Sequence, residues 1–220
     1  MIKKLLSLIF ILSGFTSFSQ NNSLGKSDPD AKKILDNVSA KFQTYKTVEA
    51  HFTLKIENSA GKNLGAKSGV VSMKNSKYRI SVSGQEIYSD GTNIWTYDKS
   101  ANEVQITKFD PSTSTITPQK MFTNFYDKDF LYKLNGESKQ GNKTLQEIEL
   151  TPVDKTKPFF KVLVDVDKKT KSIISTKVFQ KTGDRYTYTI TSMKTNTNLP
   201  DGLFVFNPAD HPKVEVIDLR

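Results

Sequence analysis

Between residues 28 and 46, apolar side chains recur at spacings of three and four residues, which predicts an amphipathic helix. Asp28 is a residue type that caps helix N-termini, and Pro29 suits the first helical position. The apolar stripe consists of Ala31, Ile34, Leu35, Val38, Phe42 and Tyr45. Because the opposite face carries charged and polar side chains, this helix needs another apolar surface to cover its stripe.

From residue 48 onwards the apolar period falls to two, which predicts β-strands. Short alternating runs, separated by turn signals rich in Gly, Asn and Asp, continue to the C-terminus. They are expected near 48–57, 64–73, 77–83, 85–89, 93–97, 103–109, 130–134, 145–151, 159–166, 173–180, 186–193 and 204–206. We therefore predict a mainly β fold with a few α-helices, in which about 11 strands form an incomplete, open antiparallel β-barrel.

A second helix interrupts the strands. Residues 110–117 contain Pro111 and many hydroxyl side chains, and Pro118 then begins a segment that we predict to be helical over 118–126. Its apolar stripe consists of Met121, Phe122, Phe125 and Tyr126. Since both predicted helices can bury their stripes only against one face of the sheet, the shorter one is a candidate lid. Its phenylalanines are equally consistent with ordinary core positions.

The first nineteen residues have the pattern of a secretory signal peptide: Lys3 and Lys4, then an apolar run, then small residues that predict cleavage after Ser19. An uncleaved anchor is the alternative, although the run is shorter than the about 20 residues that span a bilayer. Residues 20–27 are polar and predict a flexible tail. Residues 28–220 predict a single domain. With no cysteine in the chain, a lipid-modified N-terminal cysteine is excluded, and we expect a soluble periplasmic protein.

The net charge of the 220-residue chain is +9, and the chain without Lys3 and Lys4 would hold 30 basic and 23 acidic residues. A lysine-coated soluble surface explains this balance. Attraction to anionic lipid head groups or to acidic partners is the functional alternative. Nucleic acid is not an expected partner, because no basic run is interleaved with aromatic residues.

The chain lacks the residue patterns of common active sites. His51 falls on the outward phase of its strand and His211 in a loop, so both are expected at the surface rather than as metal ligands. No nucleophile elbow, phosphate-binding loop or dinucleotide fingerprint occurs. We therefore predict a binding protein with no cofactor and no metal rather than an enzyme.

The most particular stretch runs from Ser89 to Asp98 and reads Ser-Asp-Gly-Thr-Asn-Ile-Trp-Thr-Tyr-Asp. Asp90 and Gly91 predict a tight turn, and Trp95 and Tyr97, two residues apart, share one face of the following strand. This stretch, the strands before it, and the closing segments 204–208 and 214–218 together resemble the LolA family of periplasmic lipoprotein carriers. The resemblance extends from the first helix to the C-terminus.

The resemblance implies an incomplete barrel with a helical lid, whose cavity takes the acyl chains of lipoproteins and ferries them from the inner to the outer membrane. The implied partners are lipoproteins, an inner-membrane lipoprotein-releasing ABC transporter and an outer-membrane acceptor, and the implied state is a monomer. The candidate acyl-chain-binding residues of cavity and lid are Leu35, Val38, Phe42, Phe52, Leu54, Val71, Met73, Tyr78, Ile80, Trp95, Tyr97, Met121, Phe122 and Phe125.

The sequence departs from the family pattern in two places. Family members have Arg-Pro after the strand that begins at Gly69, where this chain has Lys74-Asn75-Ser76-Lys77, so the resemblance does not carry over the arginine that latches the lid to backbone carbonyls. Glu103 stands where a Gln is usual. A lipid- or protein-binding sensor built on the same half-barrel is the alternative function. A secreted hydrolase would need a nucleophile–base pair, which the pattern does not offer.

Overall fold

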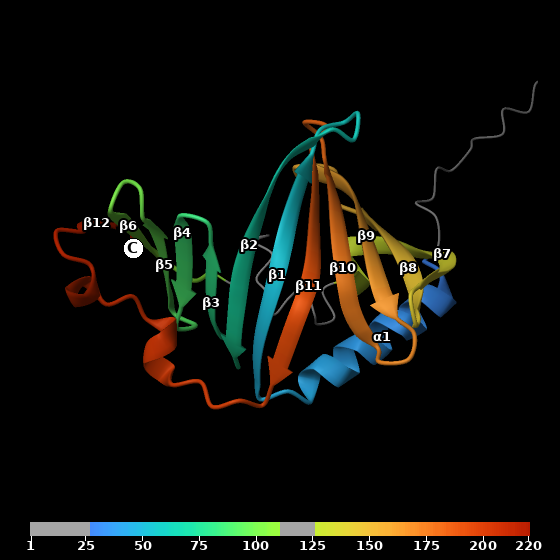
Figure 1. Cartoon of the computed structure of the whole chain (residues 1–220), viewed down its shortest axis with the longest axis horizontal. Helices are drawn as coiled ribbons and strands as arrows, with labels where there is room; N and C mark the ends of the chain where they lie inside the picture. Colours follow the sequence, from blue (N-terminus) through green and yellow to red (C-terminus); the bar gives the residue numbers. More distant parts are fainter. Residues whose placement is uncertain (1–26, 111–125) are drawn as a thin grey trace, which may run out of the picture.

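The computed structural model describes residues 27–110 and 126–220 (Figure 1). The helical elements are α1 (Pro29–Gln43), α3 (Tyr126–Asp129), η1 (Asp201–Phe204) and η2 (Pro208–Asp210), the last two being 3₁₀ turns. The strands are β1 (Thr47–Glu57), β2 (Asn63–Lys74), β3 (Lys77–Val82), β4 (Gln85–Ser89), β5 (Asn93–Asp98), β6 (Glu103–Lys108), β7 (Phe130–Gln140), β8 (Lys143–Pro152), β9 (Phe159–Asp167), β10 (Ser172–Gln180), β11 (Arg185–Thr195) and β12 (Glu215–Asp218).

All twelve of these strands form one sheet in the order β12-β6-β5-β4-β3-β2-β1-β11-β10-β9-β8-β7. The sheet is strongly curved but does not close, because β12 and β7 remain at its two edges (Figure 1). The predicted open antiparallel barrel is therefore confirmed, with two differences. The count is twelve, and the final strand, expected near 204–206, is β12, which pairs with β6 in parallel.

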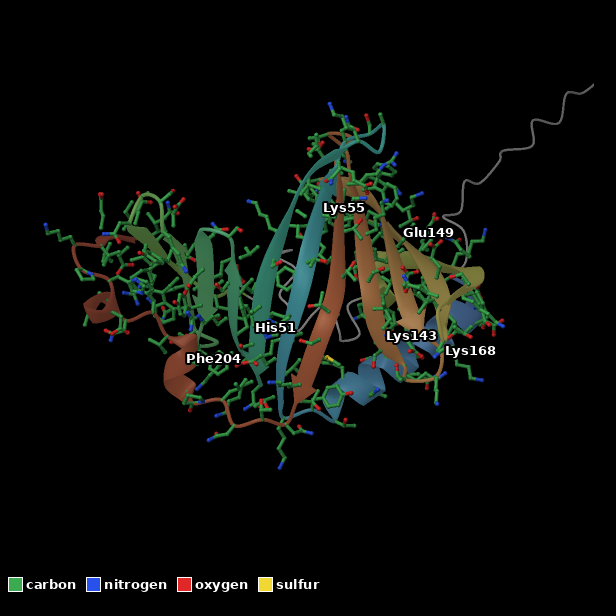
Figure 2. All side chains as sticks on the ribbon, in the orientation of Figure 1. His51, Lys55, Lys143, Glu149, Lys168 and Phe204 are labelled. Carbon is green, nitrogen blue, oxygen red and sulfur yellow. The ribbon has the colours of Figure 1, made fainter. Side chains whose placement is uncertain are left out.

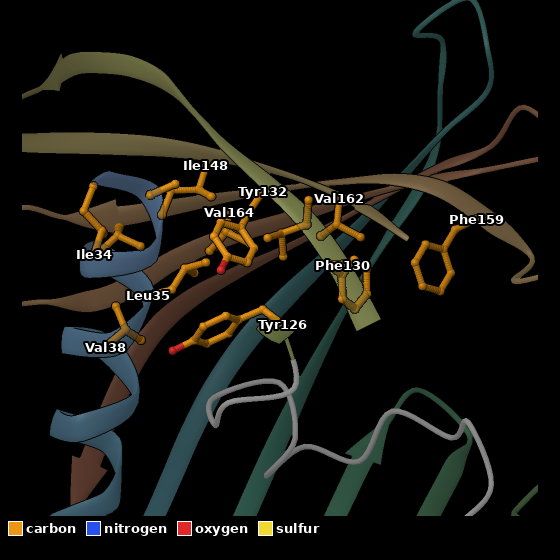
Figure 3. Packing of buried hydrophobic residues seen from close by; sticks show 13 residues of the cluster. Ile34, Leu35, Val38, Tyr126, Phe130, Tyr132, Ile148, Phe159, Val162 and Val164 are labelled. Carbon is orange, nitrogen blue, oxygen red and sulfur yellow. The ribbon is translucent and has the colours of Figure 1, made fainter. Parts of the chain in front are cut away.

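The first helix is where the apolar pattern predicts it. The Asp28 side chain accepts a hydrogen bond from the backbone N–H of Asp30, and Pro29 begins the helix. The helix ends at Gln43 rather than near residue 46, because Thr44 already caps its C-terminus. Its buried side chains pack against those of β7, β8 and β9, as the close view in Figure 3 shows. We call the face of the sheet that α1 covers the inner face.

Asp28 also joins α1 to the edge of the sheet. Its backbone N–H donates to the carbonyl oxygen of Tyr132 at 2.9 Å, and its carboxylate accepts from the backbone N–H of Leu134 at 3.1 Å. These hydrogen bonds occupy part of the free edge of β7, which would otherwise present unpaired backbone groups. The bond from the Leu134 N–H, followed by that from the Asp30 N–H, lowers the pKa of the Asp28 carboxyl.

The predicted helix over 118–126 falls mostly on residues 118–125, which lie outside the described residues. What the structure describes is its last position: Tyr126 begins the single-turn helix α3 and is buried between α1 and β7. The Tyr126 hydroxyl donates to Asp36 of α1 at 2.8 Å, and Lys32 makes ion pairs with both Asp36 and Asp127. α1 and α3 are therefore joined by a hydrogen bond and an ion pair next to their apolar contacts.

The C-terminal segment covers the outer face of β4 to β6. Chain segment 196–214 passes from the end of β11 to the far edge of the sheet (Figure 1). Its Phe206 packs with Tyr88, Trp95, Tyr97 and Val104 in a separate apolar cluster. The sheet is thus buried on its inner face at one end and on its outer face at the other. Among the described residues, no helix combines the length and apolar character needed to cross a bilayer.

Candidate functional site: an apolar cavity on the inner face

The central strands enclose an apolar cavity of about 450 Å³ on the inner face. Its walls come from β1 to β4 on one side and β9 to β11 on the other. They consist of Phe52, Leu54, Val71, Ile80, Val82, Ile87, Phe159, Ile173, Thr176, Val178, Gln180, Tyr188 and Ile190. Ile173 and Val178 also border the apolar cluster under α1, so the cavity and the helix lie on the same face of the sheet.

The cavity offers apolar contact and little else. Thr176 and Gln180 supply hydroxyl and amide groups, Tyr188 supplies a phenol, and none of the lining residues within 27–110 and 126–220 is charged. Burial raises the pKa of the Tyr188 phenol, with a smaller contribution from neighbouring Tyr186, which is what a poorly hydrated wall produces. A site of this size and chemistry suits an apolar ligand held by shape and hydrophobic contact.

Gly69 makes room for one aromatic wall of this cavity. It pairs with Phe52 across β1 and β2, and the Phe52 ring lies over it. A Cβ atom at Gly69 would stand 2.5 Å from Cζ of Phe52 and 2.8 Å from the carbonyl oxygen of Ser81. The ring could swing away from such an atom, but the backbone carbonyl belongs to the β2–β3 ladder and could not. The Phe52 and Tyr188 rings, 6.1 Å apart, form a continuous aromatic surface.

We therefore expect Gly69→Ala to destabilise the protein by about 1–3 kcal/mol, the usual cost of overpacking, and to weaken apolar ligand binding by displacing Phe52. Urea unfolding and titration with a fluorescent fatty-acyl probe measure the two effects. Gly202→Ala is the matched control, because a Cβ there meets nothing within 4 Å. Equal stability of both variants would show that the Phe52 contact does not constrain Gly69.

The structure distributes the predicted cavity and lid residues over several places. Those that line the cavity are Phe52, Leu54, Val71 and Ile80. Met73 and Tyr78 are buried beside it in the same apolar cluster. Leu35 and Val38 are buried under α1, while Phe42 borders two smaller hollows near the end of that helix. Met121, Phe122 and Phe125 lie outside the described residues.

Trp95 and Tyr97 are placed on the opposite face of the sheet from the cavity. In the register of β3, β4 and β5, Ile80 stands across from Ile87 and Ile87 across from Thr96. Thr96 is therefore on the inner face. Trp95 is its neighbour on the same strand, so its side chain points to the outer face, where it packs under the C-terminal segment. The shared face of Trp95 and Tyr97 is as predicted, but alternation alone does not tell which face becomes the inner one.

The sequence pattern did not mark the far wall, on β9 to β11, as part of a site, nor two residues of the near wall, Val82 and Ile87. The far wall consists of Phe159, Ile173, Thr176, Val178, Gln180, Tyr188 and Ile190. For Val82 the signal was available, because it lies two residues after Ile80 on the same strand and therefore shares its face. In β10 and β11, however, hydroxyl and charged side chains break the alternation, so the sequence does not mark their inner faces. Pairing of β1 with β11 brings them to the site: Phe52 stands across from Ile190 and Leu54 across from Tyr188.

A second hollow, of about 500 Å³ and polar, lies on the outer face between β3 to β5 and the C-terminal segment. The buried Glu86 carboxylate at its base accepts hydrogen bonds from Arg79, at 2.7 Å, from Lys99 and from the Tyr88 hydroxyl. Burial opposes ionisation of Glu86, but the bonds from Lys99, Tyr88 and Arg79 outweigh it and lower its pKa to about 2. Burial and this carboxylate raise the pKa of Tyr88.

We expect Glu86→Gln to destabilise the protein by about 2 kcal/mol at pH 7. Because the folded-state pKa is depressed, this stabilisation is complete above the ordinary carboxyl pKa of 4.5 and is lost as the pH falls towards 2. The difference in unfolding free energy between wild type and variant should therefore shrink between pH 5 and about 2.5. Chemical denaturation at several pH values measures it, and a constant difference would contradict the ionised network.

The lysines that replace the family's arginine contact the C-terminal segment. Lys74 Nζ donates to the carbonyl oxygen of Leu199 at 3.0 Å and pairs with Asp201 at 3.0 Å, and Lys77 pairs with the same carboxylate at 3.3 Å. A cation therefore still reaches a backbone carbonyl from this position. The carbonyl belongs to the chain after β11.

The two histidines occupy different surroundings. His51 is exposed on β1 (Figure 2), as predicted. His211 is half-buried rather than a plain surface residue, because its ring stacks on Phe206 at 4.5 Å and lies against Tyr97 at 4.4 Å. Within residues 27–110 and 126–220, no group of three or more His, Cys, Asp or Glu side chains is arranged to hold a metal ion.

Solved structures are similar to this chain at low sequence identity. An uncharacterized conserved protein from Thermus thermophilus matches with a TM-score of 0.59 at 12% identity, over 86% of this chain and 99% of that one. A LolA superfamily protein from Nitrosomonas europaea matches with 0.43 at 14% identity, over 80% and 97%. The Mycobacterium tuberculosis lipoprotein LppX matches with 0.47 at 12% identity, over 79% and 99%.

Sequence comparison gives a more specific result. No curated protein sequence matches the chain. The family model described as outer membrane lipoprotein carrier protein LolA matches residues 43–207. That span runs from the end of α1 to Asn207 and contains all the strands that line the cavity. The chain therefore belongs to the LolA family of outer membrane lipoprotein carrier proteins.

Proposed function

We propose that this protein is a periplasmic carrier that holds the acyl chains of lipoproteins in its inner-face cavity and ferries them from the inner to the outer membrane. The observation that carries the proposal is the apolar cavity of about 450 Å³ between β1–β4 and β9–β11. Membership of the LolA family supports the choice of ligand. Phe52, Leu54, Val71 and Ile80, together with the far wall, are the proposed contacts.

The energetics of lipid transfer explain why such a cavity is needed. Moving an acyl chain out of a bilayer costs about 0.8 kcal/mol per CH₂ group, so a chain of about 16 carbons costs on the order of 12 kcal/mol. A lipoprotein with several chains would leave a membrane too slowly without a protein that covers them. Apolar walls offset that cost by replacing lipid contact with protein contact.

Binding rather than catalysis is the proposed activity. Among the residues that the structure describes, the polar groups of the cavity lining are those of Thr176, Gln180 and Tyr188. This part of the lining includes neither a histidine nor a carboxylate that could act as a base beside the Thr176 hydroxyl. The proposed route requires export, with the leader removed near Ser19, loading by an inner-membrane lipoprotein-releasing ABC transporter, and delivery to an outer-membrane acceptor.

Native mass spectrometry of the protein, purified from its own periplasm without detergent, tests the proposal. The expected result is a population whose added mass corresponds to lipoprotein or to acylated fragments released from it. Protein with Leu54 changed to Glu, prepared in parallel, should be recovered without that mass. Recovery of the wild-type protein only in the free state, together with no saturable binding of a fatty-acyl probe, would overturn the carrier assignment.

A further inference from the structure

Two phenylalanines and three cations form a group on the outer face, at the ends of β9, β10 and β11. Phe160 is 51% exposed, although it is a large apolar side chain on a strand. Its ring lies 6.1 Å from that of Phe179. Lys161, Lys177 and Arg185 surround the Phe179 ring. We call these five residues the aromatic–basic patch.

The strand register explains how the patch is assembled. Phe179 stands across from Lys161 on β9 and from Arg185 on β11, so the three side chains form a row on one face. The β9–β10 pairing shifts between Phe179 and Gln180, and this irregularity places Phe160 beside Lys161 on the outer face. The irregularity thus adds an exposed apolar side chain to a row of cations.

The three cations contact one ring from different sides. Lys161 Nζ lies 4.6 Å from the Phe179 centroid, Arg185 Cζ 5.6 Å and Lys177 Nζ 5.7 Å, all within cation–π range. The aliphatic stems of these residues cover part of the ring while their charged ends stay at the surface. Such an arrangement combines apolar area with positive charge, which is the composition of side chains that settle at a membrane–water interface.

Neighbouring turns add further positive charge at the same end of the sheet. The β8–β9 and β10–β11 connections contribute Lys155, Lys157 and Lys181, and Asp154 and Asp184 are the carboxylates within them. The closest carboxylate on β1, Glu57, already forms ion pairs with Lys55 at 2.8 Å and with Lys177 at 3.3 Å. The balance at this end of the molecule is therefore basic, and it complements an anionic surface.

The patch and the cavity occupy the two faces of the same strand ends. Phe159 lines the cavity while its neighbour Phe160 is exposed on the outer face. Gln180 lines the cavity while Phe179 belongs to the patch. These ends of β9, β10 and β11 meet at the top of Figure 1. A flat surface that touches the patch would thus lie against one rim of the acyl-binding site.

We propose that the aromatic–basic patch docks this protein on a bilayer surface that carries anionic phospholipid head groups. Phe160 enters the interfacial region, and Lys161, Lys177 and Arg185 contact the head-group phosphates. The contact is weak and salt-dependent, as a carrier that must leave the membrane requires. The biological role of this docking rests on the proposed carrier function, whereas binding to an anionic bilayer can be measured independently of that function.

Flotation with vesicles tests the proposal. Full-length mature protein is mixed with vesicles of phosphatidylcholine alone or with about one-third phosphatidylglycerol, at low and at physiological salt. We expect binding to the anionic vesicles only, weakened by salt, and at least about tenfold weaker in the double variant Phe160→Ser/Lys161→Glu, because each basic residue contributes substantially at such a surface.

The matched control is Leu219→Ser/Lys143→Glu. Leu219 is 60% exposed near the C-terminus, and Lys143 lies on β8 near its junction with β7, away from the patch (Figure 2). This control should bind vesicles as wild type does. Equal binding by the patch variant, or no preference of wild type for anionic vesicles, overturns the proposal. Every variant should still bind a fatty-acyl probe, and loss of that binding in wild type would instead contradict the carrier function.

Discussion

Replacing Leu54 with glutamate is expected to abolish acyl-chain binding while the protein remains folded. Leu54 is only half-buried and forms part of the cavity wall. In the empty cavity a carboxylate there can keep water around it. An acyl chain would have to strip that water, at a cost of several kcal/mol for an ion. We expect the affinity for a fluorescent fatty-acyl probe to fall by at least about 100-fold.

Thr53→Glu provides the matched control for this result. Thr53 is adjacent to Leu54 on β1, so alternation places its side chain on the outer face. The two variants carry the same change in net charge and the same new side chain, and they differ in the face that receives it. Thr53→Glu should bind the probe as wild type does. Equal loss of binding in both variants would mean that acyl chains do not occupy the inner-face cavity.

A charge in the close-packed core should behave differently from one in the cavity. Val164 on β9 is buried against the α1 side chains, where no space is available for water around a carboxylate. Val164→Asp is therefore expected to unfold the protein. Circular dichroism separates the two outcomes: Leu54→Glu should keep the spectrum of a β-sheet, and Val164→Asp should lose it. Loss of structure in Leu54→Glu would place Leu54 in the core.

The largest stability effect of a truncation is expected for Phe204→Ala. Phe204 is fully buried, with an exposed fraction of 0%, and it anchors the 3₁₀ turn η1 against β3 (Figure 2). Removing a buried phenyl ring costs about 3–5 kcal/mol, because its transfer free energy is lost and a cavity remains in its place. For a domain of this size, the melting temperature should fall by roughly 10 °C.

Val205→Ala is the control for this substitution, because the neighbouring Val205 is 41% exposed and should change stability by less than about 0.5 kcal/mol. Trp95, the only tryptophan, reports on the same region from the cluster around Phe206. Its emission should shift to longer wavelength in Phe204→Ala at temperatures where circular dichroism still shows the sheet. A melting temperature equal to that of Val205→Ala would show that the C-terminal segment contributes little to the fold.

The local pattern of apolar, polar and turn residues determined most of the secondary structure of this protein. The spacing of Ile34, Leu35 and Val38 on one helical face, with Asp28 and Pro29 at its start, is enough to specify α1. Period-two alternation bounded by turn residues specifies the hairpins, because each short turn joins neighbours in the sequence that become neighbours in the sheet. The open barrel followed from these features, whereas the resemblance to lipoprotein carriers rested on the particular residues of segments 89–98, 204–208 and 214–218. The same alternation also predicted that the side chains of Phe52, Leu54, Val71 and Ile80 point into the cavity.

The tertiary structure alone decided which of two apolar faces becomes the cavity. Trp95 and Ile87 both read as apolar strand positions, but Phe206, more than 100 residues later, covers the face that Trp95 occupies. The far wall joins the site only because β1 pairs with β11, which sets Leu54 across from Tyr188. Alternation fixes that a strand has two faces, whereas contacts distant in sequence determine what each face meets.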